Sequence, residues 1–325
     1  MTVVTMGWKA GWSTIRQARR RILEITTGQA SGGGRCGMVC AERLQGGVSM
    51  LATTRRLLAV LLVVLAAAGC AQNRPEPGPP ATGAPVPPGA QERAVPVYFV
   101  AETGAGPRLY REFHRVVTTD PASDAVREML RGPLDPDYRT TWPSGTALRA
   151  PVTAADGVIT VDLTLGSGPA QVGTAGAEMT VQQLVYTVQG TLQSTDPVRI
   201  LVDGAPVPEL FGAVATAEPV ARGDQYAVRS LLQIDSPAEG ATVGRTVTVS
   251  GEAAAFEANV PWEVLQDGRV VQRGFTTAEV GQQFAAFRFT VTLPPGTYVV
   301  RITEDDPSDG EGRPPFTDDK TITVT

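Results

Sequence analysis

Few residues in this 325-residue chain have side chains suited to nucleophilic catalysis or metal binding. The cysteines are Cys36, Cys40 and Cys70, and the single histidine is His114. A Ser-His-Asp or Cys-His arrangement would need that histidine. It lies among charged residues at 111–116, where we expect a strand, and we expect it to face solvent in a structural role. Cys36 and Cys40 have no second cysteine or histidine pair nearby, so we interpret them as unpaired thiols and not as a CxxxC redox or metal pair.

Acidic and aromatic side chains form no catalytic motif either, since nothing selects the two carboxyl groups, about 5–10 Å apart, that a glycosidase needs. The acidic run at residues 304–311 could offer oxygens to Ca²⁺, but it lacks the EF-hand spacing and we favour a solvated loop. The Phe-Glu-Ala-Asn run at residues 256–259 would suit glycan or peptide recognition, but we favour a loop whose Phe256 plugs the core. Trp142 and Trp262 are expected to be core or rim aromatics. We therefore predict no catalytic residue, no cofactor and no metal site.

Cys70 follows a segment of a recognisable kind. Arg55 and Arg56 precede twelve uncharged apolar residues, 57–68, which match the charged start and apolar stretch of a secretory signal. Twelve residues rise only about 18 Å as a helix, which is too short for a hydrocarbon core of about 30 Å. A transmembrane helix is therefore not expected here.

The ending Leu-Ala-Ala-Ala-Gly-Cys at residues 65–70 resembles the lipobox of bacterial lipoproteins, although Ala67 stands where a larger aliphatic residue is commoner. The resemblance implies that Cys70 receives a diacylglycerol and acyl chains such as palmitate, and that the signal is cut before it. Several acyl chains would hold the protein on the extracytoplasmic face of the cell membrane. Secretion without lipidation is the alternative.

The charge is divided unevenly along the chain. Residues 1–69 carry nine basic and two acidic side chains, a net charge of +7, whereas the remainder carries 19 basic and 31 acidic ones, a net charge of −12. An acidic body of this kind repels phosphate backbones. Nucleic acid is therefore not expected as a partner.

Composition divides the chain into segments. Residues 1–49 show no sustained apolar period and Met50 begins a signal of normal length, so we interpret 1–49 as a mis-assigned N-terminal extension, with a genuine cytosolic extension as the alternative. The signal then spans 50–69, and a linker at 70–93 holds seven of the 26 prolines, which favours an extended stalk of roughly 3 Å per residue. A first folded domain is predicted at 94–215, a linker at 216–231 and a second folded domain at 232–325.

The first domain alternates strand and helix patterns. Asp120 and Pro121 suit the start of a helix that Gly132-Pro133 ends, and Asp156-Gly157 predicts a hairpin turn. The predicted elements are a strand at 95–100, a helix at 121–131, strands at 147–153 and 158–164, a helix at 177–192 and a strand at 198–202. The order β-α-β-β-α-β is that of split-βαβ domains of the α+β class.

Several runs of this domain, in this order, resemble the GerMN domain of sporulation and germination proteins over roughly residues 94–210. The runs are Val-Tyr-Phe at 97–99, Ala-Val-Arg-Glu-Met-Leu-Arg-Gly-Pro at 125–133, Pro-Ser-Gly-Thr at 143–146, Gly-Val-Ile-Thr-Val-Asp-Leu at 157–163, Gln-Leu-Val-Tyr-Thr at 183–187 and Val-Asp-Gly at 202–204. The resemblance implies an extracytoplasmic assembly or interaction module without an accepted enzymatic activity. It also implies a fold similar to ring-building domains of secretion-like complexes.

The second domain shows about seven short strands in under 100 residues, which predicts an immunoglobulin-like sandwich. Asp-Ser-Pro-Ala-Glu-Gly-Ala-Thr-Val at 235–243, Ser-Gly-Glu-Ala at 250–253, the 256–260 run and Leu-Pro-Pro-Gly-Thr-Tyr at 293–298 resemble Gmad2, the Ig-like domain associated with spore-germination proteins. That resemblance implies an envelope binding module and supplies no catalytic residues.

The sequence thus predicts a lipid-anchored, extracytoplasmic protein with a GerMN-like α+β domain and a Gmad2-like β-sandwich, and not an enzyme. We expect it to bind the membrane through Cys70 and to bind or organise envelope proteins or peptidoglycan near the membrane surface. A peptidoglycan hydrolase that uses paired carboxylates is one alternative, and a solute-binding lipoprotein is a weaker one.

Overall fold

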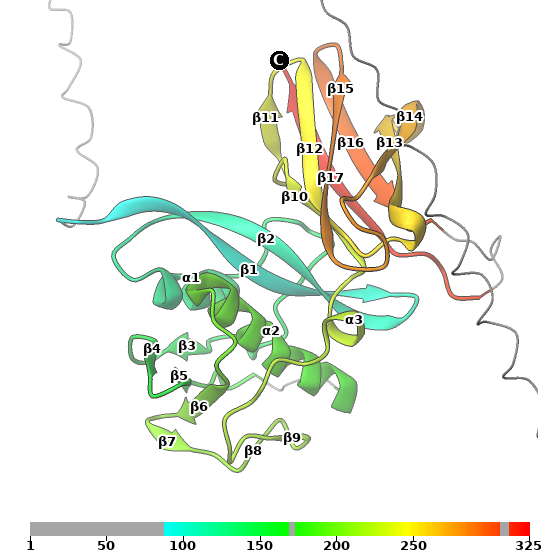
Figure 1. The fold of residues 1–325 in the computed structure, drawn as a ribbon. Helices are drawn as coiled ribbons and strands as arrows, with labels where there is room; N and C mark the ends of the chain where they lie inside the picture. The colour runs from blue at the N-terminus through cyan, green and yellow to red at the C-terminus, as the bar shows by residue number, and fades with distance from the viewer. Residues whose placement is uncertain (1–87, 169–172, 306–311) are drawn as a thin grey trace, which may run out of the picture. The chain divides into compact units, whose positions relative to one another are not determined.

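The computed structural model describes residues 88–168, 173–305 and 312–325 (Figure 1). They form an α+β domain followed by an all-β sandwich, so the predicted fold class is confirmed. Among the described helices, none combines the length and hydropathy of a membrane-spanning helix. The predicted extension at 1–49, the signal at 50–69 and most of the proline-rich linker lie outside the described residues.

The α+β domain begins with a long β-hairpin of strands β1 (Gln91–Thr103) and β2 (Gly106–Thr118). The hairpin is longer than the strand predicted at 95–100, and β1 starts within the stretch predicted as linker. The strand expected at 111–116 is the second half of β2. Its buried face was not predicted, because Glu112 and His114 occupy inward-facing positions where apolar residues would have marked the alternation. A two-stranded hairpin is marginal alone, so its stability depends on the helices that pack against it.

Helices α1 (Pro121–Arg131) and α2 (Thr174–Leu192) lie between the hairpin and a small sheet, as Figure 1 shows. The predicted caps of α1 are confirmed: the Asp120 carboxylate accepts a hydrogen bond from the Ser123 N–H at 3.2 Å, and Gly132 follows the last turn with φ of 115°. Almost every side chain of α2 between Ala177 and Gln189 is buried, because the helix meets neighbours on most of its faces.

The small sheet is built around strand β5. Its members are β3 (Ala147–Leu148), β4 (Thr153–Ala155), β5 (Val158–Thr164), β6 (Val198–Val202) and β7 (Ala205–Pro206). A separate small pair, β8 (Glu209–Leu210) and β9 (Val214–Ala215), follows. β1 pairs with β2 and stays out of this sheet, and one apolar core joins its Val97 and Phe99 to α1, α2 and Val161 of β5.

The sandwich has two sheets packed over a second apolar core. One sheet orders β10 (Leu232–Ser236), β12 (Thr246–Ala253) and β15 (Ala285–Thr292). The other orders β11 (Ala241–Val243), β17 (Thr317–Val324), β16 (Gly296–Thr303), β13 (Asn259–Gln266) and β14 (Arg269–Thr277). The seven predicted strands are present, and β11 is an additional short strand.

Residues 216–231, predicted as a linker, include the short helix α3 (Gln225–Val228) and pack against the α+β domain. Val220 forms a two-hydrogen-bond bridge with Val198, and the Tyr186 hydroxyl donates to the Gly223 carbonyl at 2.9 Å. The connection is therefore held in place before the chain enters β10.

Candidate interaction site

The two edges of the β1–β2 hairpin are only partly covered. In an antiparallel ladder every second residue directs its backbone N–H and C=O away from the partner strand. In β1 these are the even-numbered residues: Tyr98 donates its N–H to the Thr187 hydroxyl at 3.1 Å, and Val100 exchanges two hydrogen bonds of 2.9 Å with Arg139. Helix α2 and the backbone of Arg139 thus cover part of this edge. Helix α2 ends before it reaches the start of β1, which leaves that start uncovered by the helix.

In β2 the outward-directed residues are odd-numbered. The Leu109 carbonyl accepts from the Ser230 N–H at 2.9 Å, and the Arg111 N–H donates to the Gln233 side chain at 3.2 Å. Beyond Arg111, no other described residue bonds to the outward backbone groups of β2. The hairpin therefore has a covered end near its turn and an open end, which we define as residues 91–96 and 113–118.

Apolar side chains gather at the open end of β2. Phe113 is 36% exposed and Val117 is 56% exposed, both on the outer face of the strand. An uncovered strand with apolar side chains is a template for pairing with another chain, so this end is the candidate interaction site.

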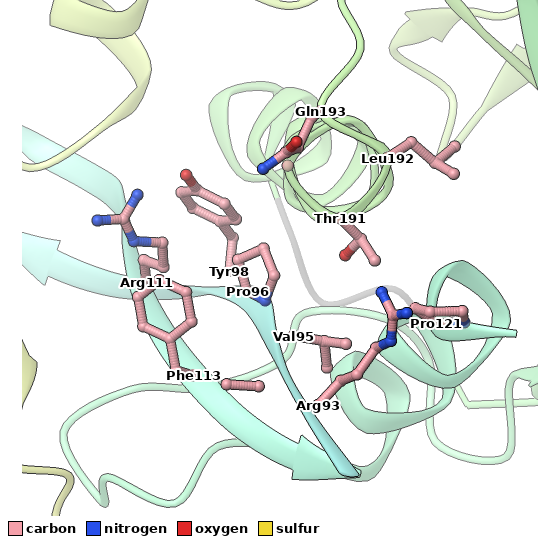
Figure 2. A pocket seen from close by; sticks show the side chains of 12 residues that line it. Arg93, Val95, Pro96, Tyr98, Arg111, Phe113, Pro121, Thr191, Leu192 and Gln193 are labelled. Carbon is pink, nitrogen blue, oxygen red and sulfur yellow. The ribbon is translucent and has the colours of Figure 1, made fainter. Parts of the chain in front are cut away.

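A groove of about 470 Å³ borders the open end on the β1 side (Figure 2). It lies where the last residues of α2 meet the start of β1, and its polar lining comes from Arg93, Arg111, Thr191 and Gln193. The Arg111 guanidinium lies 5.0 Å from the centre of the Phe113 ring, which forms the apolar side of the groove. The carboxylates of Asp235 and Glu252 balance the charge of Arg111, so the groove combines an aromatic surface with polar groups and the guanidinium of Arg93.

His114 is buried, so the predicted solvent-facing position is wrong. Its ring lies between two carboxylates, with Nε2 at 2.7 Å from Glu112 and Nδ1 at 3.1 Å from Glu128. Burial lowers the pKa of His114, but these hydrogen bonds and charges outweigh burial and raise it above its usual value. The two carboxylates lie on opposite ring nitrogens and do not converge on one point, and the described residues hold no metal-ligand cluster.

The Glu112 carboxylate also fixes the loop after α1, because it accepts the N–H groups of Leu134 and Asp135 at 2.9 and 2.8 Å. Asp135 in turn accepts a hydrogen bond of 2.6 Å from Lys320, a buried residue of β17 in the sandwich. Lys320 also donates to Asp318 at 2.9 Å and to the Tyr138 hydroxyl at 2.7 Å, so the two domains share a buried ionic cluster.

This cluster holds one cation and two carboxylates, an excess of negative charge. Burial raises the pKa of Asp318 to about 6, since the charge of Lys320 compensates only in part. Burial lowers the pKa of Lys320, but the charges of Asp318 and Asp135 outweigh burial and raise it. Both groups therefore hold their protons more firmly than usual, which keeps Lys320 charged across the physiological range.

A second ionic cluster lies where the sandwich meets β2. Arg111 donates to both oxygens of Asp235, at 3.1 and 2.6 Å, and lies 3.2 Å from Glu252. Arg229 donates to the other oxygen of Glu252 at 2.6 Å. These contacts tie the sandwich to the covered end of the hairpin, and the Lys320 cluster ties it to the loop after α1. Within the described part of the chain, neither cluster includes a residue of the open end.

Cys36, Cys40 and Cys70 lie outside the described residues. The other residues singled out from the sequence lie apart from this site where they are described. Trp142 is buried and Trp262 stacks on Phe289 at 4.8 Å, so both are core or rim aromatics as predicted. In the acidic run, Glu304 pairs with Arg313 at 2.7 Å, residues 306–311 are not described, and the Ca²⁺ question stays untested.

The prediction that Phe256 plugs the sandwich core is wrong, since this side chain is 45% exposed. Ala255 and Ala258 are buried in its place. Glu257 and Ala258 adopt φ values of 50° and 63°, and this left-handed turn directs Phe256 away from the core.

Comparison with family models matches residues 96–208 to Germane, described as sporulation and spore germination, and residues 231–311 to Gmad2, the immunoglobulin-like domain of bacterial spore germination. The chain carries a Germane domain followed by a Gmad2 domain. The two resemblances drawn from the sequence are confirmed, and the β2 part of the open end, 113–118, lies within the Germane match.

Solved structures resemble the two domains at low identity. The tandem GerMN domains of the sporulation protein GerM from Bacillus subtilis match at 19% identity and a TM-score of 0.32, over 41% of this chain and 46% of that one. A lytic polysaccharide monooxygenase from Jonesia denitrificans matches at 19% identity and a TM-score of 0.21, over 27% of this chain and 60% of that one. A CARDB domain of PF1109 from Pyrococcus furiosus matches at 12% identity and a TM-score of 0.20, over 29% of this chain and 92% of that one. The chain thus spans about half of the GerM structure, and these likenesses carry no functional argument. No curated protein matches the chain.

Proposed function

We propose that this protein is a lipid-anchored, extracytoplasmic binding and assembly module of the cell envelope, of the sporulation or germination type. The Germane and Gmad2 domains support a non-catalytic function of that type. The open end of the hairpin carries the proposal, because it presents exposed apolar side chains and backbone groups that bond to no residue in the described part of the chain, while the rest of the hairpin is covered. A partner on the envelope would bind there.

The two ionic clusters support an assembly function by fixing the Gmad2 domain to the covered end of the hairpin and to the loop after α1. Lys320 bonds to residues of both domains, and Arg111 joins β2 to Asp235. A partner at the open end would therefore meet a Germane domain that the sandwich already braces. Our hypothesis is that the Gmad2 domain positions the Germane domain and that the lipid on Cys70 keeps both near the membrane.

Site-specific photo-crosslinking in living cells tests the binding site. A benzoylphenylalanine residue in place of Val117 should capture an envelope protein, whereas the same residue in place of Val271 should not. Val271 is a matched control because it is 48% exposed, close to the 56% of Val117, but lies on β14 of the sandwich. Identical products at both positions would contradict the proposal.

Metabolic labelling with an alkyne analogue of palmitate tests the anchor. The natural chain should be labelled and should fractionate with membranes, and Cys70→Ala should lose both properties. Labelling that persists in Cys70→Ala would contradict the anchor. Release of muropeptides from purified sacculi by the purified protein, lost on changing one carboxylate, would contradict the non-catalytic part of the proposal.

A further inference from the structure

The open edge of β2 can form a continuous ladder, and the open edge of β1 cannot. Phe113, Arg115 and Val117 each direct a backbone N–H and C=O away from β1, and no described residue bonds to these backbone groups. β1 carries Pro96 at the equivalent outward position, and a proline nitrogen has no hydrogen to donate. A third strand would therefore add to β2.

The chain already extends this same edge with its own residues. Leu109 forms a parallel bridge with Arg229 and accepts the Ser230 N–H. The chain then turns into β10, and Gln233 reaches the Arg111 N–H with its side chain in place of its backbone. The intrachain interface stops there, and the next outward position along β2, Phe113, begins the unpaired stretch.

The side chains of the open edge define what an added strand would carry. Successive side chains of a strand point to opposite faces, so every second residue of an added strand would lie beside Phe113, Arg115 or Val117. Apolar residues beside Phe113 and Val117 would cover their exposed surface. A carboxylate beside Arg115 would pair with a guanidinium whose side chain is 79% exposed and whose present ion pair, with the exposed Glu92 at 3.4 Å, is long.

We propose that this edge binds an extended segment of a partner protein with the pattern apolar-x-acidic-x-apolar, by strand addition. The inference rests on the proposed function, because it names the kind of partner that the open end receives. The chain's own linker does not fit the pattern, since its prolines at 75, 77, 79, 80, 85 and 87 lack the N–H groups that a ladder requires.

Titration with fluorescent peptides tests the inference on the full chain in detergent. The probe is Thr-Val-Thr-Glu-Thr-Val-Thr, compared with two versions that are N-methylated at the odd or at the even positions. Only one set of N–H groups can face β2, so one methylated version should bind at least about tenfold more weakly than the other. Replacing the central Glu by Lys should also weaken binding. Equal affinities for the two methylated versions, or no binding of the unmethylated probe, would overturn strand addition.

Two variants place the binding on the proposed edge. Val117→Pro removes an outward N–H that has no partner within the described chain, and we expect at least about tenfold weaker binding, whereas Val117→Thr keeps the N–H and should bind within about threefold of the natural chain. Thermal unfolding checks that Val117→Pro folds. If it does not, Arg115→Glu serves instead and should prefer the Lys probe over the Glu probe. Unchanged binding in these variants would overturn the inference.

Other occupants give different results. A concentration-dependent dimer that Val117→Pro abolishes in sedimentation experiments would overturn the inference in favour of a second copy. Sedimentation with peptidoglycan sacculi that depends on Val117 would overturn it in favour of the cell-wall polymer. Crosslinks from Val117 to an envelope protein without peptide binding would overturn strand addition alone, whereas peptide binding without such crosslinks would count against the proposed function and leave strand addition standing.

Discussion

The two halves of β2 lie on one ribbon but differ in what covers their outer edge. At Leu109 and Arg111 the edge is covered by residues 229–233, and the Arg111 side chain joins a partly buried ionic cluster. From Phe113 to Val117 the edge is uncovered, and the apolar side chains reach solvent. The sandwich therefore stabilises one half of the strand, whereas the other half has its outer edge available for a partner.

The largest expected effect on stability comes from removing the charge of Lys320, which joins the sandwich to the loop after α1. Lys320→Met leaves the buried carboxylates of Asp135 and Asp318 without their cation, so we expect the free energy of unfolding to fall by about 3–5 kcal/mol. Urea denaturation measures it. Arg301→Met is the matched control, because the Arg301–Asp319 pair on the neighbouring strand is partly exposed and should contribute about 1 kcal/mol or less. Equal losses in both variants would contradict this interpretation.

A smaller effect on stability is expected at Gly251 of β12, which pairs with β10 next to the segment that covers β2. A Cβ at this position would lie 1.9 Å from the Gln233 carbonyl oxygen, so Gly251→Ala should displace that segment and cost about 1–3 kcal/mol. Gly244→Ala in the same domain has no atom within 4 Å of the new Cβ and should be neutral or slightly stabilising. A stable Gly251→Ala protein with an unchanged melting temperature would show that the close approach is not required.

The His114 cluster, beneath the boundary between the two halves, predicts a dependence on pH. Its raised pKa means that protonated His114 contributes stability below the usual histidine pKa, and this contribution is lost as the pH rises through the raised value. His114→Gln should therefore be less stable than the natural chain at pH 5.5, and the difference should shrink towards pH 9. Denaturation at a series of pH values measures it, and a constant difference would contradict the prediction.

The smallest effect on stability is expected at the open half. Val117→Ala should change the free energy of unfolding by about 0.5 kcal/mol or less, because this side chain is 56% exposed. Val97→Ala, in the fully buried part of β1, should cost about 1.5–3 kcal/mol. Thermal unfolding of the two variants compares them. A large loss in Val117→Ala would mean that the open half is required for folding and is not reserved for binding.

Elements with local signals were predictable from the sequence. Helix α1 has its capping Asp120 and its terminating Gly132, and the turn at Asp156-Gly157 has positive φ values of 54° and 73°. These features depend on a few neighbouring residues, whose steric and hydrogen-bonding preferences act in any fold. The domain resemblances likewise rest on runs of adjacent residues.

The candidate site was not predictable in the same way. A strand was expected at 111–116, but Glu112 and His114 break its apolar alternation, so their inward, buried positions were not predicted. The sequence held one signal for the Lys320 cluster. Asp318, Lys320 and Ile322 occupy successive inward-facing positions of β17, so a charged pair in line with an apolar residue could have indicated a buried ionic cluster.

The sequence by itself determined the two domain types, the local caps and turns, and the lipobox-like segment that ends at Cys70. The tertiary structure decided which charges are buried and which edge of the hairpin stays open. Ser230 covers Leu109 and Lys320 neutralises Asp135 across separations of more than 100 residues. Such contacts follow from the packing of whole domains, and for this reason no local pattern could show that Phe113 and Val117 would remain uncovered.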